Sequence, residues 1–436
     1  MEPRQPGAGD RAILVGVKLK GKPSPWTIED SLEELRHLAI TAGLEVVGIT
    51  SQKIARPDPA TWIGSGKAQE LKDILTAQEA AYVLFDDELS PAQTRNLEKI
   101  LGAEVRIIDR PRLILDIFGQ HASSREGQLQ VELAQYQYLL PRLTGSHAGL
   151  AQQVGGTGAG PVGLRGPGET QLELDRRQAR RRIAVLKREL EEVRTQRRQQ
   201  RKQRERAGVP VVAIVGYTNA GKSSLLNALT GAQVLVQDKL FATLDPTTRR
   251  LALPGGREAL LTDTVGFIRK LPHDLVAAFR ATLEGVEEAS LIVHVVDSSH
   301  PHASELAATV DSVLASLKVG STPRLVAWNK IDILAAGALP VAPTQSNVDS
   351  IEISAKTGEN LGALLAKIEK MLGEALVSLR ILIPYDRYDL LGLLYAQATV
   401  EEREDAAQGI RLLVSVPEGL AERLAEFTDR EFQSWR

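Results

Sequence analysis

The chain has 436 residues, of which 43% are hydrophobic and 25% charged, so it can bury several apolar cores and is expected to form about three domains. Its net charge of −2 and its ordinary globular composition argue against wholesale disorder and against a global attraction to nucleic acid. The absence of cysteine excludes disulfides and thiolate metal sites. With neither a secretory signal nor a run of about 20 apolar residues, we expect a cytoplasmic protein and leave partial membrane association open.

Residues 1–115 are predicted to form a small, mostly parallel α/β domain, because short apolar runs alternate with segments of helical spacing. The acidic trio Asp86, Asp87 and Glu88 could be catalytic or bind a metal, but a polar strand end beside a helix start is favoured. The stretch Ile63–Lys67 resembles a phosphate loop without its spacing, and a strand-to-helix turn is favoured there. Strands are expected at Ala12–Leu19, Leu44–Ile49, Ala81–Phe85 and Val105–Ile108, and helices at Ser31–Ala42, Gly66–Ala77 and Ser90–Leu101.

Residues 116–208 are predicted to form a basic helical hairpin with a glycine-rich connector. Apolar side chains recur every three or four residues between Leu129 and Leu143 and again between Leu172 and Val193, which indicates two helices packed like a short antiparallel coiled coil. Pro141 should kink or end the first helix. The segment Thr144–Gly168 holds nine glycines and two prolines. It is either a flexible linker or a connector that enters a crowded RNA site where side chains would not fit.

The second helix of this hairpin is the most basic part of the chain. Between Arg176 and Arg206 there are fourteen Lys or Arg and four Asp or Glu, a net charge of +10 in a chain whose total is −2. A charge run is often only a solvated face. The density and the single sign favour a partner with a phosphate backbone, whose binding would be sensitive to salt.

The stretch VVAIVGYTNAGKSS (Val211–Ser224) matches the GxxxxGK(S/T) phosphate loop, with a strand before it and a helix after it. Glycine lets consecutive backbone N–H groups curl around a phosphate that faces the positive end of the helix. Lys222 would reach the outer phosphates and the Ser223 hydroxyl would bind Mg²⁺. A plain glycine-rich turn is the competing interpretation. The expected nucleotide-binding residues are Gly216, Tyr217, Thr218, Asn219, Ala220, Gly221, Lys222 and Ser223.

A threonine-rich loop, FATLDPTTR (Phe241–Arg249), is expected between two strands. A hydroxyl or the backbone of such a loop can sense the γ-phosphate and magnesium. We expect Thr243 to bind the metal, with Thr247 and Thr248 as weaker candidates. The residues of this loop assigned to the nucleotide site are Phe241, Ala242, Thr243, Leu244 and Asp245.

The predicted strand Ala259–Thr262 leads into a DTVG motif, which is assigned to the nucleotide site as Asp263, Thr264, Val265 and Gly266. Here a carboxylate can hold a magnesium-bound water and the glycine N–H can contact the γ-phosphate. The next residue is Phe267, where many GTPases carry the glutamine that orients the attacking water. A phenyl ring cannot make that hydrogen bond, so slow intrinsic hydrolysis is predicted and no catalytic residue is assigned. Asn219 resembles the asparagine of GTPases that bind a monovalent cation, and K⁺ is therefore a further candidate cofactor.

Two more strands, Leu291–Val296 and Arg324–Trp328, lead to Asp297 and to an NKID motif. In NKxD a carboxylate accepts from the ring N–H and the exocyclic amine of guanine, the amide addresses the other edge, and the lysine stem covers the base. Adenine lacks the matching donors, so such a pocket is expected to reject it by a factor of about 10⁴ or more. Residues 209–375 therefore predict a guanine-nucleotide domain with a mostly parallel sheet and helices on both faces. The residues assigned to the base pocket are Asn329, Lys330, Ile331, Asp332, Ser354, Ala355 and Lys356.

Residues 376–436 are predicted to form a small α+β domain to which no chemistry can be assigned. The loop histidines His300 and His302 are given no metal, because two imidazoles on a loop are usually solvated. The strands of this last domain are expected at Leu379–Ile383 and Ile410–Val416, and its helices at Tyr388–Ala398 and Glu418–Phe427.

Over its whole length the chain resembles the HflX family of ribosome-associated GTPases. The resemblance rests on the motifs GYTNAGKS, FATLDPTTR, DTVGFI and NKID, and most specifically on GGTGAGPVGLRGPGETQLELDRR (Gly155–Arg177). It implies GTP hydrolysis stimulated by the large ribosomal subunit, with the hairpin and the first domain near the peptidyl-transferase region, and a role in splitting or rescuing stalled ribosomes. Members of the family are also reported to bind ATP through the first domain, for which this sequence shows no convincing motif.

The resulting hypothesis is a monomeric GTPase whose nucleotide state controls its affinity for ribosomal RNA. Mg²⁺ is the expected cofactor, GTP and GDP are substrate and product, and neither DNA nor a membrane-spanning segment is involved. One alternative is a nucleotide-driven remodeller of ribosomal RNA with an ATP site in the first domain. Another is a scaffold that merely holds GTP.

Overall fold

The protein folds as two compact units in the computed structural model. The first contains Met1–Val193 with Gln237–Asp245 and Ile268–Thr282, and the second contains Arg194–Val236, Pro246–Phe267 and Leu283–Arg436. Within the described part of the chain, no helix combines the length and the apolar character needed to cross a membrane. The structure describes residues 9–21, 26–143, 167–207, 209–231, 241, 247–270, 285–317, 319, 322–334, 349–374, 376–417, 420–421 and 424–428.

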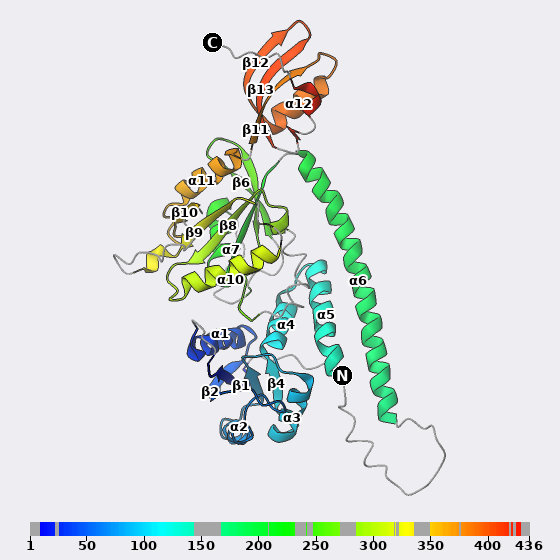
Figure 1. Cartoon of the computed structure of the whole chain (residues 1–436), viewed down its shortest axis with the longest axis vertical. Helices are drawn as coiled ribbons and strands as arrows, with labels where there is room; N and C mark the ends of the chain where they lie inside the picture. The colour runs from blue at the N-terminus through cyan, green and yellow to red at the C-terminus, as the bar shows by residue number, and fades with distance from the viewer. Residues whose placement is uncertain are drawn as a thin grey trace. The chain divides into compact units, whose positions relative to one another are not determined.

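The N-terminal domain is a parallel sheet in the strand order β2-β1-β3-β4, with helices on both faces (Figure 1). Helices α1 and α4 pack together, and so do α2 and α3. All four predicted strands are present, but the second continues to Ile54, beyond the expected end at Ile49. The elements are β1 (Arg11–Leu19), α1 (Ile28–Thr41), β2 (Glu45–Ile54), α2 (Ser65–Ala77), β3 (Tyr82–Phe85), α3 (Pro91–Leu101), β4 (Arg106–Asp109) and α4 (Arg110–His121).

Side-chain caps explain where the helices of this domain begin. Before α3, the Ser90 hydroxyl accepts from the Gln93 N–H, the Gln93 side chain accepts from the Ser90 N–H, and proline fills the first helical position. Thr27 and Asp30 make the same reciprocal pair before α1. The helices then bury leucines such as Leu97 against the strands, and shortening a buried leucine of this kind to alanine costs about 2–5 kcal/mol.

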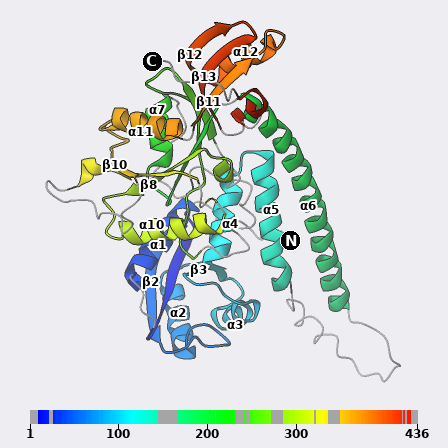
Figure 2. The ribbon, with the colours of Figure 1, turned by 45° about the horizontal axis from the view of Figure 1, so that its top comes forward.

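Helices α5 (Arg125–Leu139) and α6 (Pro167–Ala207) lie side by side, as Figures 1 and 2 both show. Arg125 near the start of α5 pairs with Glu189 at 2.6 Å, whereas Glu132 further along pairs with Arg182 at 2.6 Å, so the helices run antiparallel as predicted. Their apolar seam consists of Leu129, Leu133, Leu186 and Leu190, with Tyr136, Ile183 and Val193 partly buried beside it.

The ends of the two hairpin helices follow their prolines. Helix α5 gives way to the 3-10 helix η1 (Leu140–Arg142), which contains Pro141, as a missing backbone N–H requires. Helix α6 begins at Pro167, so it starts inside the connector predicted to end at Gly168, because proline is well suited to the first helical position.

The P-loop domain has a six-stranded sheet in the order β10-β9-β8-β5-β7-β6, in which only the pairing of β6 with β7 is antiparallel among the described strands. Helices α7 and α11 bury their leucines on one face, and α10 covers the other through Ala303. The predicted fold class is confirmed. The elements are β5 (Val211–Gly216), α7 (Lys222–Thr230), β6 (Thr247–Ala252), β7 (Glu258–Asp263), β8 (Leu291–Asp297), α10 (Ala303–Ser316), β9 (Arg324–Asn329), η2 (Ile331–Ile333), β10 (Asp349–Glu352) and α11 (Leu361–Glu374).

The C-terminal domain is an antiparallel sheet in the order β11-β13-β12, packed against α12 (Tyr388–Gln397). Strand β11 (Leu376–Ile383) and strand β13 (Gly409–Pro417) are close to the predicted ones, and η3 (Ala425–Phe427) lies inside the last predicted helix. Strand β12 (Thr399–Ala406) was not predicted. Its sequence TVEEREDA is polar, and it is a strand because it pairs with β13 at the edge of the sheet.

Candidate nucleotide site

The phosphate loop between β5 and α7 depends on two glycines. A Cβ at Gly216 would lie 2.3 Å from the Val295 carbonyl oxygen, and a Cβ at Gly221 would lie 2.2 Å from Asn329 Nδ2. Gly221 also has a φ of 94°, in the left-handed region that favours glycine. Asn219 has a φ of 61°, which asparagine tolerates better than most side chains. Glycine is therefore needed at both positions for the loop to pack against the ends of β8 and β9.

Lys222 opens α7 with a buried ammonium group. Only 7% of the residue is exposed, and its Nζ donates to the Tyr217 carbonyl oxygen at 2.7 Å. Burial lowers the pKa of Lys222, the charge of Asp263 opposes this shift and the charge of Lys330 adds to it, so that the pKa is about 8. A buried cation at the start of a helix, beside a glycine-rich loop, is suited to attract a polyphosphate anion.

Two hard oxygen donors lie together beside this lysine, at the place where magnesium was predicted. The Ser223 hydroxyl donates to Asp263 Oδ2 at 2.7 Å, and Asp263 is fully buried at the end of β7. Mg²⁺ prefers oxygen ligands and usually keeps several waters, which fits one hydroxyl and one carboxylate that acts through water. Thr264 donates to the Ile214 carbonyl oxygen at 2.7 Å, so its hydroxyl fixes β7 against β5.

The residues after Thr264 are held against the phosphate loop. The Phe267 N–H donates to the Gly216 carbonyl oxygen at 3.0 Å, and the Thr218 N–H donates to the Phe267 carbonyl oxygen at 2.8 Å. A Cβ at Gly266 would lie 2.9 Å from Lys222 Nζ, so glycine is needed there too. Phe267 is only 5% exposed. At the position of the usual glutamine this chain therefore has a buried ring that carries no hydrogen-bonding group.

The residues predicted to read the base lie in two segments, the NKID motif and the turn at Ser354–Ala355, and the first of these also contacts the phosphate loop. Asn329, at the end of β9, donates through Nδ2 to the Ala220 carbonyl oxygen at 2.8 Å and accepts through Oδ1 from the Ala355 N–H at 2.9 Å. The Ser354 hydroxyl donates to Asp332 Oδ1 at 2.7 Å. Asp332 is exposed, so its carboxylate is accessible to a base. The geometry thus joins the NKID motif to the phosphate loop on one side and to the Ser354–Ala355 turn on the other.

The threonine-rich loop is only partly visible. Ala242, Thr243, Leu244 and Asp245 lie outside the described residues. The expectation that the loop runs to Arg249 is wrong, because Thr247 and Thr248 already belong to β6, where they pair with Asp263 and Thr262. The Thr248 hydroxyl lies 3.0 Å from that of Thr262, so a cross-strand bond occupies this weaker metal candidate.

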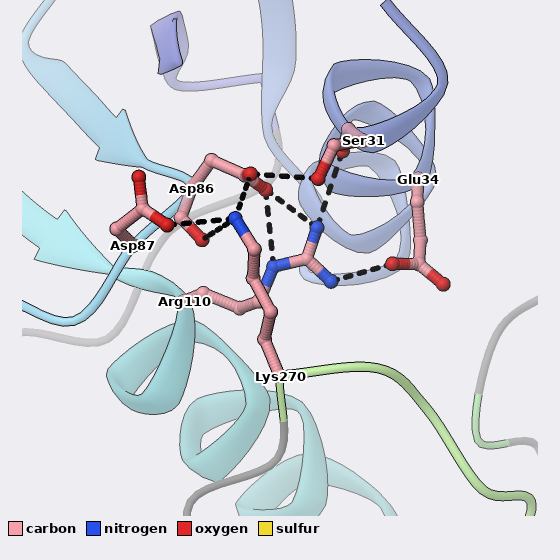
Figure 3. Close-up of polar contacts among 6 residues, drawn as sticks. All are labelled: Ser31, Glu34, Asp86, Asp87, Arg110 and Lys270. Carbon is pink, nitrogen blue, oxygen red and sulfur yellow. Dashed lines mark hydrogen bonds and ion pairs between the residues drawn. The ribbon is translucent and has the colours of Figure 1, made fainter. Parts of the chain in front are cut away.

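The acidic trio of the N-terminal domain is placed at a strand end, and Asp86 is the centre of a buried ion network (Figure 3). Its carboxylate accepts from the Arg110 Nη2 at 2.6 Å and from the Ser31 hydroxyl at 2.7 Å, and Lys270 also donates to it. Burial raises the pKa of Asp86, but the charges of Arg110 and Lys270 outweigh it, so that pKa lies below its usual value. Arg110, 1% exposed, also donates to Glu34 at 2.6 Å.

Lys270 is a residue that sequence reasoning missed. It stands four residues after Gly266, yet it packs within the first unit, where it donates to Asp86 and lies 2.7 Å from Asp87. Its neighbour Arg269 stacks over the Trp26 ring at 4.1 Å. No local sequence pattern could have predicted these partners, because Lys270 lies 184 positions after Asp86 and 183 after Asp87.

The second phosphate-loop-like stretch, Ile63–Lys67, leads into α2 from a loop and not directly from a strand, because β2 ends at Ile54. Gly64 precedes the first turn of α2, and its N–H donates to the Gln52 side chain at 3.0 Å. Lys67 pairs with Glu70 of the same helix at 2.7 Å. Its cation is thus directed at a carboxylate on its own helix.

Four family models match the chain. Residues 29–119 match the "GTP-binding GTPase N-terminal" model and residues 121–204 the "GTP-binding GTPase Middle Region". Residues 211–330 match the "50S ribosome-binding GTPase" model, and residues 341–434 match the "HflX C-terminal domain".

Curated relatives match over most of the chain. A GTPase HflX from Caldanaerobacter subterraneus is 48% identical over 418 residues, which cover 96% of this chain and 94% of the relative. The GTPase HflX of Escherichia coli is 45% identical over 369 residues, 84% of each chain. Among solved structures, a GTP-binding protein from Sulfolobus solfataricus in complex with GDP is 26% identical, with a TM-score of 0.44, over 84% of this chain and 99% of that one.

Proposed function

The chain belongs to the HflX family of GTPases, and from this premise we propose that it works on the large ribosomal subunit. It binds GTP and hydrolyses it to GDP and phosphate. The proposed role is to bind the subunit in the cytoplasm, to be stimulated there, and to split or rescue stalled ribosomes. The observation that carries this proposal is the match of residues 211–330 to a family of 50S ribosome-binding GTPases, joined in one chain to a strongly basic helix.

Helix α6 supplies the proposed surface for ribosomal RNA. Its apolar seam faces α5, and Arg182 pairs with Glu132 of that helix, whereas several other basic side chains of α6 are exposed. A protein that neutralises several phosphates releases counterions, and its affinity then falls steeply with salt. The exposed basic residues among those described are Arg177, Arg180, Arg181, Lys187 and Arg188.

Two chain segments support a link between the nucleotide and this surface. Gly266 lies beside Lys222 in the second unit, whereas Lys270 is bound to Asp86 and Asp87 in the first. Phe241, at the start of the threonine-rich loop, packs edge-on against Phe118 of α4 with ring centroids 4.5 Å apart. In GTPases the segments near the γ-phosphate rearrange on hydrolysis. A rearrangement at Gly266 would therefore be passed along the chain to Lys270, which is bound within the unit that contains most of the hairpin.

The chemistry expected of the site is positioning and charge neutralisation. Lys222 and the phosphate-loop N–H groups would hold the phosphates, and Ser223 with Asp263 would hold Mg²⁺, which supplies positive charge at the transferred phosphate. Phe267 cannot orient a water, so hydrolysis by the free protein should be slow. The subunit is proposed to complete the site, and K⁺ near Asn219 is a second proposed source of charge.

The test of this function is GTP turnover with and without purified large subunits. Stimulation of at least tenfold is expected, and it should fall as salt displaces the basic helix. Equal rates in both conditions would remove the proposed coupling. A Lys222→Ala variant separates the enzyme from a scaffold, because a scaffold would keep its ribosome binding and cellular function without turnover.

A further inference from the structure

The carboxylate of Asp297 lies next to the base-reading motif but belongs to none of the GTPase motifs. Asp297 is the last residue of β8, directly opposite Asn329 in the register of β8 with β9. Its Oδ2 lies 2.7 Å from Lys330 Nζ, and the two side chains are 17% and 24% exposed. This ion pair is therefore largely shielded from solvent. A charge contact in such a place contributes more than one on an open surface.

Asp297 is itself held in place. Its Oδ1 accepts from the Ser299 N–H at 3.0 Å and from the Ser299 hydroxyl at 2.5 Å, which leaves Oδ2 directed at Lys330. The next residue, Ser298, donates from its N–H to the Asn329 carbonyl oxygen at 2.9 Å, and its hydroxyl donates to the same oxygen. The end of β8 thus fixes both the backbone and one side chain of the base-reading turn.

Lys330 needs such support because of its backbone and its length. Its φ of 68° places it in the left-handed region, which is a strained conformation for a residue other than glycine. A lysine side chain also loses much of its rotamer freedom when it is fixed. Asn329 is fixed by Ala220 and Ala355, and Asp332 is fixed by Ser354. Asp297 does the same for Lys330.

We propose that Asp297 is a positioning residue for guanine recognition, acting through Lys330. By holding the ammonium group, it keeps the aliphatic stem of Lys330 in the place where that stem covers the base, before any nucleotide arrives. A pocket ordered in advance avoids the entropy cost of ordering the side chain on binding. The inference concerns nucleotide affinity and is independent of the proposed ribosomal role.

The substitution Asp297→Asn tests this proposal with little change in shape. The amide can keep the acceptor that Ser299 uses, but it removes the charge that binds Lys330. We expect the Kd for GDP to rise about tenfold, mainly through faster dissociation, while the rate of the chemical step at saturating GTP is unchanged. Asp349→Asn is the matched control, since Asp349 makes an exposed ion pair with Lys367 at 3.7 Å in the same domain.

A double-mutant cycle with Lys330→Met separates positioning from a structural role. In the Lys330→Met background, Asp297→Asn should have no further effect on GDP affinity. In the parent protein, Asp297→Glu keeps the charge, so it should weaken GDP binding less than Asp297→Asn does. Equal losses in both backgrounds, or an unchanged Kd for Asp297→Asn, would overturn the proposal. Because the parent protein binds GDP in the same assay, a failure of this proposal is distinct from a failure of nucleotide binding.

Discussion

Replacing Lys222 by methionine should make the nucleotide-free protein more stable while it abolishes nucleotide binding. Burial lowers the pKa of this lysine from 10.5 to about 8, so the folded chain holds a charge that its surroundings disfavour. A shift of that size corresponds to about 3 kcal/mol of stability lost at neutral pH. Loss of the hydrogen bond to the Tyr217 carbonyl oxygen would cost about 1 kcal/mol, so a net gain of about 2 kcal/mol is expected.

The sign of this effect follows from the proton balance. Between pH 8 and 10.5 the unfolded chain binds a proton at Lys222 that the folded chain has lost, so the contribution of Lys222 to stability rises with pH in this window. Below pH 8 the cost is present in full. The advantage of Lys222→Met should therefore be greatest at neutral pH and should disappear above pH 10.5.

Hydrogen exchange of the β5 and α7 amides in the nucleotide-free protein measures the opening free energy of this region. It should be compared at pH 7 and at pH 9.5 for the parent, Lys222→Met and Lys222→Arg. The arginine variant keeps the charge and should gain nothing. The reasoning is refuted if Lys222→Met opens as easily as the parent at pH 7, or if the difference between them does not shrink at the higher pH.

Three further outcomes are expected. Asp332→Asn should weaken GTP binding at least a hundredfold and create affinity for xanthosine triphosphate, because the base-facing carboxylate becomes an amide; nucleotide titrations would show this. Glu34→Gln should destabilise the N-terminal domain by about 3 kcal/mol in urea unfolding, because Arg110 is fully buried and keeps its charge, whereas the exposed Glu33→Gln should change little. Joint replacement of Arg180 and Arg181 by alanine should lower the slope of log affinity for large subunits against log salt by about 2, and an unchanged slope would exclude these residues as phosphate contacts.

Much of the fold could be predicted from the sequence because its signals are local. The strand, loop and helix around Gly221 and Lys222 follow from spacing alone, and Ser90–Pro91 announces the start of α3. The antiparallel hairpin follows from two apolar seams joined by a connector. In each case the residues that cause the structure lie within a few turns of one another.

The remainder depends on partners far away in the chain. Strand β12 has a polar sequence and forms a strand because its backbone pairs with that of β13. Arg110 is fully buried because Glu34 and Asp86, from two other parts of the chain, pair with its guanidinium group. The ion pair of Asp297 with Lys330 arises only when β8 and β9 lie in register. No periodicity within a single element carries such information.

The central claim is tested most directly by co-sedimentation with large ribosomal subunits. The protein would be measured with GDP and with a non-hydrolysable GTP analogue, each across a series of salt concentrations. If the nucleotide controls the affinity of the basic hairpin for ribosomal RNA, the protein with the GTP analogue should remain bound to the subunits at salt concentrations that release the protein with GDP. Identical release curves for the two nucleotides would contradict that claim.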